Sequence, residues 1–159
     1  MIRDKYRSFK DALKYSYQAA WVERVTPSND FLEEHPVRAL INPNKLKPDY
    51  DDKVISVEFE HEYQCGDVFE WKNTDTYWLI YLQDLTELAY FRGDIRKCRY
   101  QISWKDGNEI KTTFAAVRGP VETKIDYIQK HGVSIDTPNY SLHILMPATE
   151  SAIKYFTRY

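Results

Sequence analysis

The chain has 159 residues, with 22 basic and 24 acidic side chains and a formal net charge of −2. That length suits one domain, and a hydrophobic share of 43% is typical of a globular protein and not of a disordered chain. The balanced charge argues against a general polyanion binder, although it leaves room for a local basic patch. Aromatic residues reach 15%, with 13 tyrosines, which suits half-buried strands and protein interfaces alike.

The cysteines and the lack of long apolar runs indicate the expected compartment. Cys65 and Cys98 are too far apart in the sequence for a metal knuckle or a redox pair, so we expect two free thiols. No apolar run approaches the roughly 18 residues that a membrane span needs. Met1–Lys5 lacks the apolar stretch of a signal peptide. These features predict a protein that is made and kept in a cytoplasm, without a membrane partner.

Residues 1–25 are predicted to form one amphipathic N-terminal helix. Its apolar and aromatic residues recur at three- and four-residue steps, which places them on one stripe: Ile2, Tyr6, Phe9, Leu13, Tyr17 and Ala20. The opposite face is rich in Lys and Arg, and the turn cluster Thr26–Asp30 ends the helix. A basic amphipathic helix could contact a membrane surface or a partner, but packing on its own domain is the more common role.

Residues 26–53 are predicted to be an ordered, Pro-rich connection without helix or strand. Pro36, Pro43 and Pro48 interrupt both kinds of structure, and Asn42-Pro43-Asn44 is a turn signature. Apolar residues between the prolines still allow the segment to pack on a core. We therefore expect one domain overall, with its β structure in residues 54–159.

From residue 54 the pattern changes to a period of two. Ile55, Val57 and Phe59 alternate with Ser56, Glu58 and Glu60, which predicts a strand with one solvated face. Further apolar and aromatic runs at 68–71, 76–82 and 85–95 predict three more strands.

A change of parity follows within this apolar run. Phe91 and Ile95 share one face, whereas Cys98 and Trp104 have the opposite parity. Such a change needs an extra residue, so we expect a bulge or bend near Gly93–Lys97.

The register of the next hairpin is predicted from side-chain chemistry. A two-residue loop at Asp106-Gly107 would place Trp104 opposite Glu109. A three-residue loop, 106–108, would instead pair Trp104 with Ile110 and set Lys105 against Glu109. The apolar match and the opposite charges favour the three-residue loop.

The last third of the chain carries weaker signals. The sequence predicts a strand that ends at Ala116, a short helix over 123–130, a strand around 140–144, and a last helix over 150–156 capped by Thr149. The expected fold class is mainly β (α+β). We expect a small antiparallel β-barrel or sandwich with an N-terminal amphipathic helix and a short C-terminal helix.

Patterns that would indicate catalysis are weak. No phosphate loop, dinucleotide fingerprint, zincin or nucleophile-elbow motif occurs. His61 stands four residues before Cys65, which invites a nucleophile–base pair, but the simpler reading is a strand end followed by a turn. Glu58, Glu60 and Glu62 most simply form the solvated face of a strand, and Glu70 is a further carboxylate. We predict no enzyme activity, no catalytic residue, no metal and no cofactor.

The strongest functional signal is the interleaving of basic and aromatic residues over 90–100. Nucleic-acid surfaces combine such residues, because bases stack on rings and cations neutralise phosphates. An aromatic row facing the core, with charges on the solvated side, explains the same pattern and is the more common case. Repeated around a ring of subunits, a few arginines per copy would still make a strong basic collar.

Several stretches together resemble tailed-bacteriophage virion proteins of the head–tail connector or head-completion type, that is, stopper or adaptor proteins. They are Arg38-Ala-Leu-Ile-Asn-Pro-Asn-Lys-Leu-Lys47, Asp49-Tyr-Asp-Asp-Lys53, Gly66-Asp-Val-Phe-Glu-Trp71, Trp78-Leu-Ile-Tyr-Leu-Gln83, Leu85-Thr-Glu-Leu-Ala-Tyr-Phe-Arg92, Leu145-Met-Pro147 and Tyr155-Phe-Thr-Arg158. The match covers most of the chain after residue 37, with structural rather than catalytic motifs. The family leads us to expect further strands beyond Tyr159, so the chain would be a shorter relative or a fragment.

The resemblance implies a structural virion protein that forms a ring below the portal, with portal, adaptor or tail proteins as neighbours. It would surround the exiting genome and contact double-stranded DNA without sequence preference. The expected DNA-facing residues are Arg92, Arg96, Lys97 and Arg99, and the expected subunit contacts are Tyr6, Phe9, Leu13, Tyr17 and Phe91. The alternative is a monomeric nucleic-acid-binding module of the OB or SH3-like type.

Overall fold

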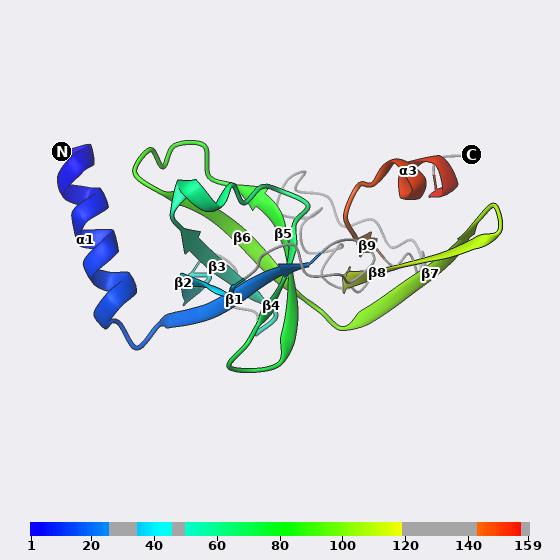
Figure 1. The fold of residues 1–159 in the computed structure, drawn as a ribbon, viewed down its shortest axis with the longest axis horizontal. Helices are drawn as coiled ribbons and strands as arrows, with labels where there is room; N and C mark the ends of the chain where they lie inside the picture. Colours follow the sequence, from blue (N-terminus) through cyan, green and yellow to red (C-terminus); the bar gives the residue numbers. More distant parts are fainter. Residues whose placement is uncertain (26–34, 46–49, 119–142, 157–159) are drawn as a thin grey trace, which may run out of the picture.

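The computed structural model describes residues 1–25, 35–45, 50–118 and 143–156 (Figure 1). Its elements in chain order are α1 (Ile2–Tyr15), β1 (Ala19–Val25), β2 (Val37–Pro43), β3 (Asp52–Val57), the 3₁₀ helix η1 (Phe59–His61), β4 (Val68–Trp71), β5 (Thr76–Gln83), β6 (Phe91–Cys98), β7 (Tyr100–Asp106), β8 (Glu109–Arg118), β9 (His143–Leu145) and α3 (Glu150–Phe156). Within these ranges, neither helix is long and apolar enough to cross a bilayer.

Six of the strands close into an antiparallel barrel in the order β1-β2-β3-β6-β5-β4, while β7, β8 and β9 form a separate three-stranded sheet. Helix α1 lies at one end of the molecule, and the β7–β8 hairpin with α3 lies at the other (Figure 1). The predicted mainly β class, the antiparallel barrel and the two helices are thereby confirmed.

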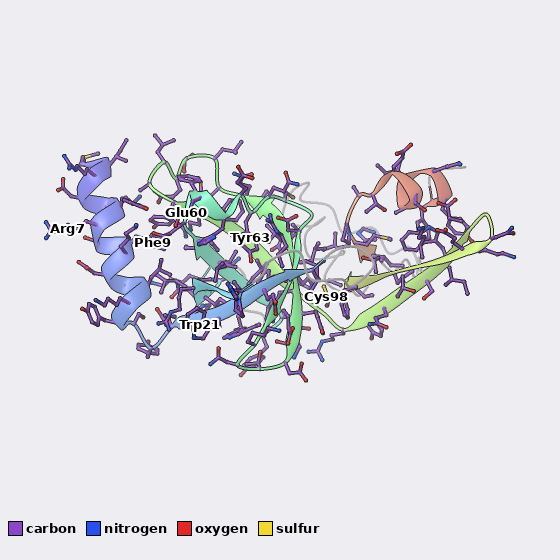
Figure 2. The ribbon with its side chains drawn as sticks, in the orientation of Figure 1. Arg7, Phe9, Trp21, Glu60, Tyr63 and Cys98 are labelled. Atoms are coloured by element: carbon purple, nitrogen blue, oxygen red, sulfur yellow. The ribbon has the colours of Figure 1, made fainter. Side chains whose placement is uncertain are left out.

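The barrel interior is filled by side chains that alternate inward along each strand. Its largest members include Phe69, Phe91 and Trp78, and Tyr63 from the β3–β4 connection joins them inside (Figure 2). Tyr63 meets Phe69 edge to face, with ring centroids 6.4 Å apart. The interior is therefore a packed core and not a ligand cavity, as expected for a barrel with few strands.

A β-bulge bends the barrel wall, but it lies in β5 and not in β6 as predicted. The register shifts between the pairs Ile80↔Ile95 and Leu82↔Asp94, so the extra residue is Tyr81. Gly93 faces the bulge: a Cβ there would lie 2.9 Å from the carbonyl oxygen of Leu82. The bulge can approach β6 closely because Gly93 has no side chain.

The parity change along β6 has a different cause from the predicted bulge. Direct cross-strand partners form a row on the outer face of the barrel, and every member is buried: Val25, Val68, Leu79, Arg96 and Asp52. Strand β8 packs against β5 and β6 near this row, and the ring of Phe114 stacks on Tyr77 at 3.8 Å. This end of β6 is thus buried on both faces, so its apolar pattern loses strict alternation.

Helix α1 is shorter than the predicted helix over residues 1–25. It ends at Tyr15, and residues 19–25 form strand β1, which pairs with both β2 and β4. Ala20 was assigned to the helical stripe, but it faces the barrel core. The prediction extended the helix too far because Ala20 keeps the helical spacing from Leu13 and Tyr17. The same residue is equally compatible with a strand.

The predicted Pro-rich connection over 26–53 also contains barrel strands. Val37–Pro43 forms β2, between β1 and β3, and β3 begins at Asp52. Pro43 is compatible with β2 because it stands at the end of the strand. Residues 26–34 and 46–49 lie outside the described residues. The barrel therefore starts at residue 19 and not at residue 54.

The strand predicted from residue 54 begins earlier and ends sooner. β3 ends at Val57, and Phe59–His61 forms η1, which is followed by Glu62 in the left-handed region at φ 50°. Phe59 is consequently exposed, and Glu58, Glu60 and Glu62 do not form a solvated strand face. Phe59 lies in the turn after β3 and continues the alternating apolar pattern of the strand only by chance. The predicted strands at 68–71 and 76–82 are confirmed in β4 and β5.

The β7–β8 hairpin differs from both predicted registers. Its loop has two residues, but they lie one position later than in the two-residue loop considered above. Asp106 pairs with Glu109, so Gly107 and Asn108 form the loop and Trp104 faces Lys111. Gly107 has a φ of +63°, which suits the first position of a type II′ turn. The predicted pairing of Trp104 with Ile110 is wrong, because Trp104 is buried next to α3 while Ile110 stays exposed.

The predicted C-terminal helix is confirmed as α3. The amide N–H of Ala152 donates to Thr149 Oγ1 at 3.3 Å, which confirms the predicted cap. Strand β8 continues two residues beyond the predicted end at Ala116, and His143–Leu145 forms the short strand β9. The helix predicted over 123–130 and the start of the strand predicted around 140–144 lie outside the described residues.

Candidate interaction surface

The residues predicted to face DNA do not form a basic surface. Arg96 is buried in the outer row of the barrel, where its Nη1 lies 2.8 Å from Asp52 Oδ2. Arg99 donates two hydrogen bonds to Asp51, both of 2.7 Å. These arginines belong to ion pairs that hold β6 to β3, so the prediction for Arg96 is wrong.

The two other predicted DNA-facing residues are more accessible than Arg96. Arg92 is exposed, with Nη1 3.7 Å from Asp84 Oδ2. Lys97 is half-buried. Arg92 and Arg99 are thus both exposed, but each lies beside a carboxylate, and the opposite charge offsets its field.

The predicted subunit contacts are mostly core residues. Phe91 lies inside the barrel, and Phe9 and Leu13 are on the buried side of α1. The predictions for these three residues are therefore wrong. Tyr6 is half-buried, and Tyr17 keeps 94% of its surface exposed. Packing of α1 on its own domain, the more common of the two roles considered, is what the structure contains.

A ring stack and a hydrogen bond hold α1 against the barrel. Phe9 points toward the barrel while Arg7 points away from it (Figure 2). The Phe9 ring stacks on Tyr90 with centroids 4.1 Å apart. Arg38 of β2 donates from Nη2 to the carbonyl oxygen of Leu13 at 2.9 Å, near the C-terminus of the helix. A cation there satisfies an otherwise unpaired carbonyl and complements the helix dipole.

Ion pairs reinforce both sides of this helix. On one side, Lys5 Nζ lies 2.6 Å from the buried carboxylate of Glu87. Burial alone would raise the pKa of Glu87, but the hydrogen bond from Lys5 and the amide of Ala89 outweigh it and lower that pKa. The same hydrogen bond raises the pKa of Lys5. Glu87 therefore remains charged and connects the β5–β6 loop to α1.

The second pair lies between α1 and the end of β3. Lys10 Nζ is 3.0 Å from Glu58 Oε1, and Tyr6 donates its hydroxyl hydrogen to the same oxygen at 3.2 Å. Burial favours a higher pKa for Glu58, but these two donors lower it. Glu58 is thus a structural anchor with its charge already compensated.

An open apolar groove of about 440 Å³ lies where α1, η1 and the β5–β6 loop meet. Its lining combines the first turns of α1 with η1 and the loop: Ile2, Arg3, Tyr6, Phe59, Glu60, Leu88 and Ala89. Leu85, from the same loop, is 78% exposed. Exposed apolar side chains concentrated on a concave surface are typical of a binding site for another macromolecule or an apolar ligand.

Little in the sequence indicates this groove. Phe59 had the parity of a core residue, and Leu85 and Leu88 belonged to a predicted strand, whereas residues 84–90 form a loop between β5 and β6. The one available signal was the spacing of two leucines among polar residues after Asp84, which does not fit strict alternation.

One group of side chains among the described residues has metal-like spacing. Single ligand atoms of Glu58, Glu60 and His61 lie within 4.8 Å of one another beside the groove. Glu58 already accepts hydrogen bonds from Lys10 and Tyr6, so a cation would have to compete with the helix anchor. The trio is therefore better explained as part of the α1 contact.

The cysteines and the remaining carboxylate are explained by their surroundings. Cys65 is exposed and makes no hydrogen bond with His61 in the described part of the chain. Cys98 is buried at the junction of barrel and outer sheet, and this burial raises its thiol pKa to about 12. A thiol with such a pKa is a poor nucleophile at neutral pH. Glu70 contacts Lys72 at 2.7 Å, so it too is paired.

Comparison of the chain with protein-family models, with curated proteins and with solved structures gives no match. The resemblance to head–tail connector proteins therefore stays a prediction, and the proposal that follows depends on the surfaces of the molecule.

Proposed function

We propose that this protein is a structural subunit of the head–tail connector ring of a tailed phage, resident in the virion. It would assemble with its own copies and with portal, adaptor or tail proteins around the genome exit channel. The single observation that carries this proposal is the apolar groove formed by α1, η1 and the β5–β6 loop. The sequence resemblance supplies the class of assembly, and the groove supplies a surface through which a subunit can bind.

A binding role also agrees with how the barrel is built. The closed sheet has no free edge, and its interior is occupied by aromatic and aliphatic side chains. A small molecule would find no room there, so recognition has to use the outside of the molecule. On that outside, Ile2, Phe59 and Leu88 of the groove are exposed, and burying them against a partner would be favourable.

Contact with duplex DNA, if the ring surrounds it, is better assigned to α1 than to β6. Arg7 and Lys14 are exposed on the helix, and Arg7 makes no ion pair within the described residues. Repetition around a ring would multiply these charges. Binding without sequence preference would then weaken steeply as salt is added.

The alternative is a monomeric nucleic-acid-binding module. Exposed Trp21 stacks with Arg38, whose guanidinium lies 5.0 Å from the ring, and a base could stack on such a platform. The carboxylates beside Arg92 and Arg99 argue against this alternative, because they weaken the attraction for phosphates along β6.

Light scattering and native mass spectrometry of the full chain would test the proposal. We expect concentration-dependent assembly beyond a dimer, either alone or on addition of a portal or adaptor ring. A particle that stays monomeric in both conditions, and binds short single-stranded oligonucleotides with salt-dependent affinity, would favour the alternative module.

A further inference from the structure

We infer that the apolar groove of one copy receives helix α3 of a second copy, in a head-to-tail contact. This inference rests on the proposed ring assembly and names the two surfaces that would join its subunits. The groove lies at the α1 end of the molecule and α3 lies at the opposite end (Figure 1). One copy cannot fill its own groove with its own α3. A contact between two different surfaces is the kind that closes rings.

The groove offers apolar side chains from three separate segments. Ile2, Phe59 and Leu88 line it while remaining 52%, 47% and 66% exposed. The ion pairs Lys5–Glu87 and Lys10–Glu58 fix the helix, the loop and the end of β3 relative to one another. The receiving surface is therefore formed before binding, which reduces the entropy lost on association.

Helix α3 is fixed on one side and apolar on the other. Ser151 accepts a hydrogen bond from Trp104 Nε1 at 3.0 Å and donates one to Asp106 at 2.6 Å. Ala152 is buried on the same side. Ile153 remains 50% exposed, whereas the 47% exposed ring of Phe156 meets Trp104 edge to face, with centroids 5.9 Å apart. This arrangement presents a short helix whose Ile153 side chain can enter a groove, a common mode of helix recognition.

The charges around the two surfaces are complementary. The groove carries Arg3 from α1 and Glu60 from η1, which are opposite in sign. Helix α3 carries Glu150 and Lys154, four residues apart and therefore on one face of the helix. With Ile153 in the groove, Glu150 can pair with Arg3 while Lys154 pairs with Glu60. This pairing favours a second copy of the chain over an unrelated apolar ligand.

Two aspartate variants of the full chain test the contact in sedimentation velocity experiments. Leu88→Asp blocks the groove and Ile153→Asp blocks α3, and both side chains are exposed enough to leave folding intact. Each variant alone should associate at least about tenfold more weakly than the unmodified chain, because the interface would bury an unpaired carboxylate. Ile110→Asp is the matched control: Ile110 is 76% exposed at the hairpin and belongs to neither surface. It should associate normally.

Mixing the two variants gives the sharpest outcome. Each retains the surface that the other has lost, so an equimolar mixture should form a heterodimer that cannot grow further. A charge exchange provides an independent test of orientation. Arg3→Glu or Glu150→Arg alone should weaken association about two- to fivefold, and the two reversals together should restore it.

The results separate this inference from the ring proposal. If the unmodified chain assembles but neither aspartate variant weakens it, the subunits use other surfaces and the inference is wrong. If both variants are monomeric and their mixture gives no heterodimer, α3 does not enter the groove of a second copy and the inference is also wrong. An unmodified chain that remains monomeric alone and with portal or adaptor rings would instead overturn the proposed function.

Discussion

The barrel and the outer sheet differ in how they bury their apolar side chains. Twelve buried residues fill the barrel, and its six strands close on themselves without a free edge. Among the residues that the structure describes, the second cluster has five buried members, of which only Phe114 comes from the sheet β7–β8–β9. The other four belong to β1, β4, β5 and β6.

This difference indicates which region is stable by itself. A closed barrel satisfies its backbone hydrogen bonds and its core from its own residues. The outer sheet instead needs the barrel surface to bury Phe114, and its exposed side chains at α3 favour a further partner. We expect the barrel to carry most of the free energy of unfolding, with the outer sheet as a region that can open separately.

The largest effect is expected from the barrel core. Phe69→Ala removes a fully buried ring that contacts Tyr63, and should lower the free energy of unfolding by about 3–5 kcal/mol. Chemical denaturation would measure this loss, which should extend to all regions of the molecule. Phe156→Ala is the matched control: that ring is half-exposed, so its loss should be much smaller. Comparable losses for the two variants would contradict the view that the barrel dominates stability.

The buried ion pair between β3 and β6, in the outer row of the barrel, should have the next largest effect. Asp52→Ala leaves Arg96 charged and buried in the outer row, at a cost of about 3 kcal/mol. Replacing both partners, as in Asp52→Leu with Arg96→Met, should recover most of that loss because no unpaired charge remains. Denaturation of the single and double variants measures the difference. A single variant as stable as the unmodified chain would mean that solvent reaches Arg96.

A smaller and local effect is expected at the junction. Phe114→Ala removes the ring stacked on Tyr77 and should cost about 2 kcal/mol. Hydrogen exchange should show lost protection in β7 and β8, while the amides of β3 and β5 keep theirs. Uniform loss across both regions would mean that barrel and outer sheet unfold as one unit.

The smallest effect concerns α1 and depends on pH. The lowered pKa values of Glu58 and Glu87 stabilise the docked helix as long as both carboxylates are ionised. This contribution is fully present above the ordinary value of 4.5 and is lost as the pH falls through the lowered values. The protection of the α1 amides relative to their intrinsic exchange rate should therefore be unchanged between about pH 7 and pH 5 and should fall in stronger acid. Glu58→Gln with Glu87→Gln should exchange faster already at neutral pH. Unchanged protection in that double variant would exclude the ion pairs as anchors.

Part of the candidate surface was visible in the sequence. Helical periodicity places Tyr6 on the apolar stripe of the predicted N-terminal helix, and this residue lines the groove. The same stripe includes Phe9 and Leu13, but they form the buried side of that helix. Periodicity identifies an apolar face and cannot distinguish burial against the same chain from burial against another chain.

Local patterns alone determined the strands β4 and β5, the capped helix α3 and the mainly β class, because each depends on neighbouring residues only. Tertiary structure decided that residues 19–25 form a strand, because closure of the barrel requires a partner between β2 and β4. It also decided that Arg96 is buried, since the row it joins is assembled from five strands. The groove depends in the same way on segments far apart in the chain. Contacts between such segments have no period in the sequence, so only the folded molecule reveals them.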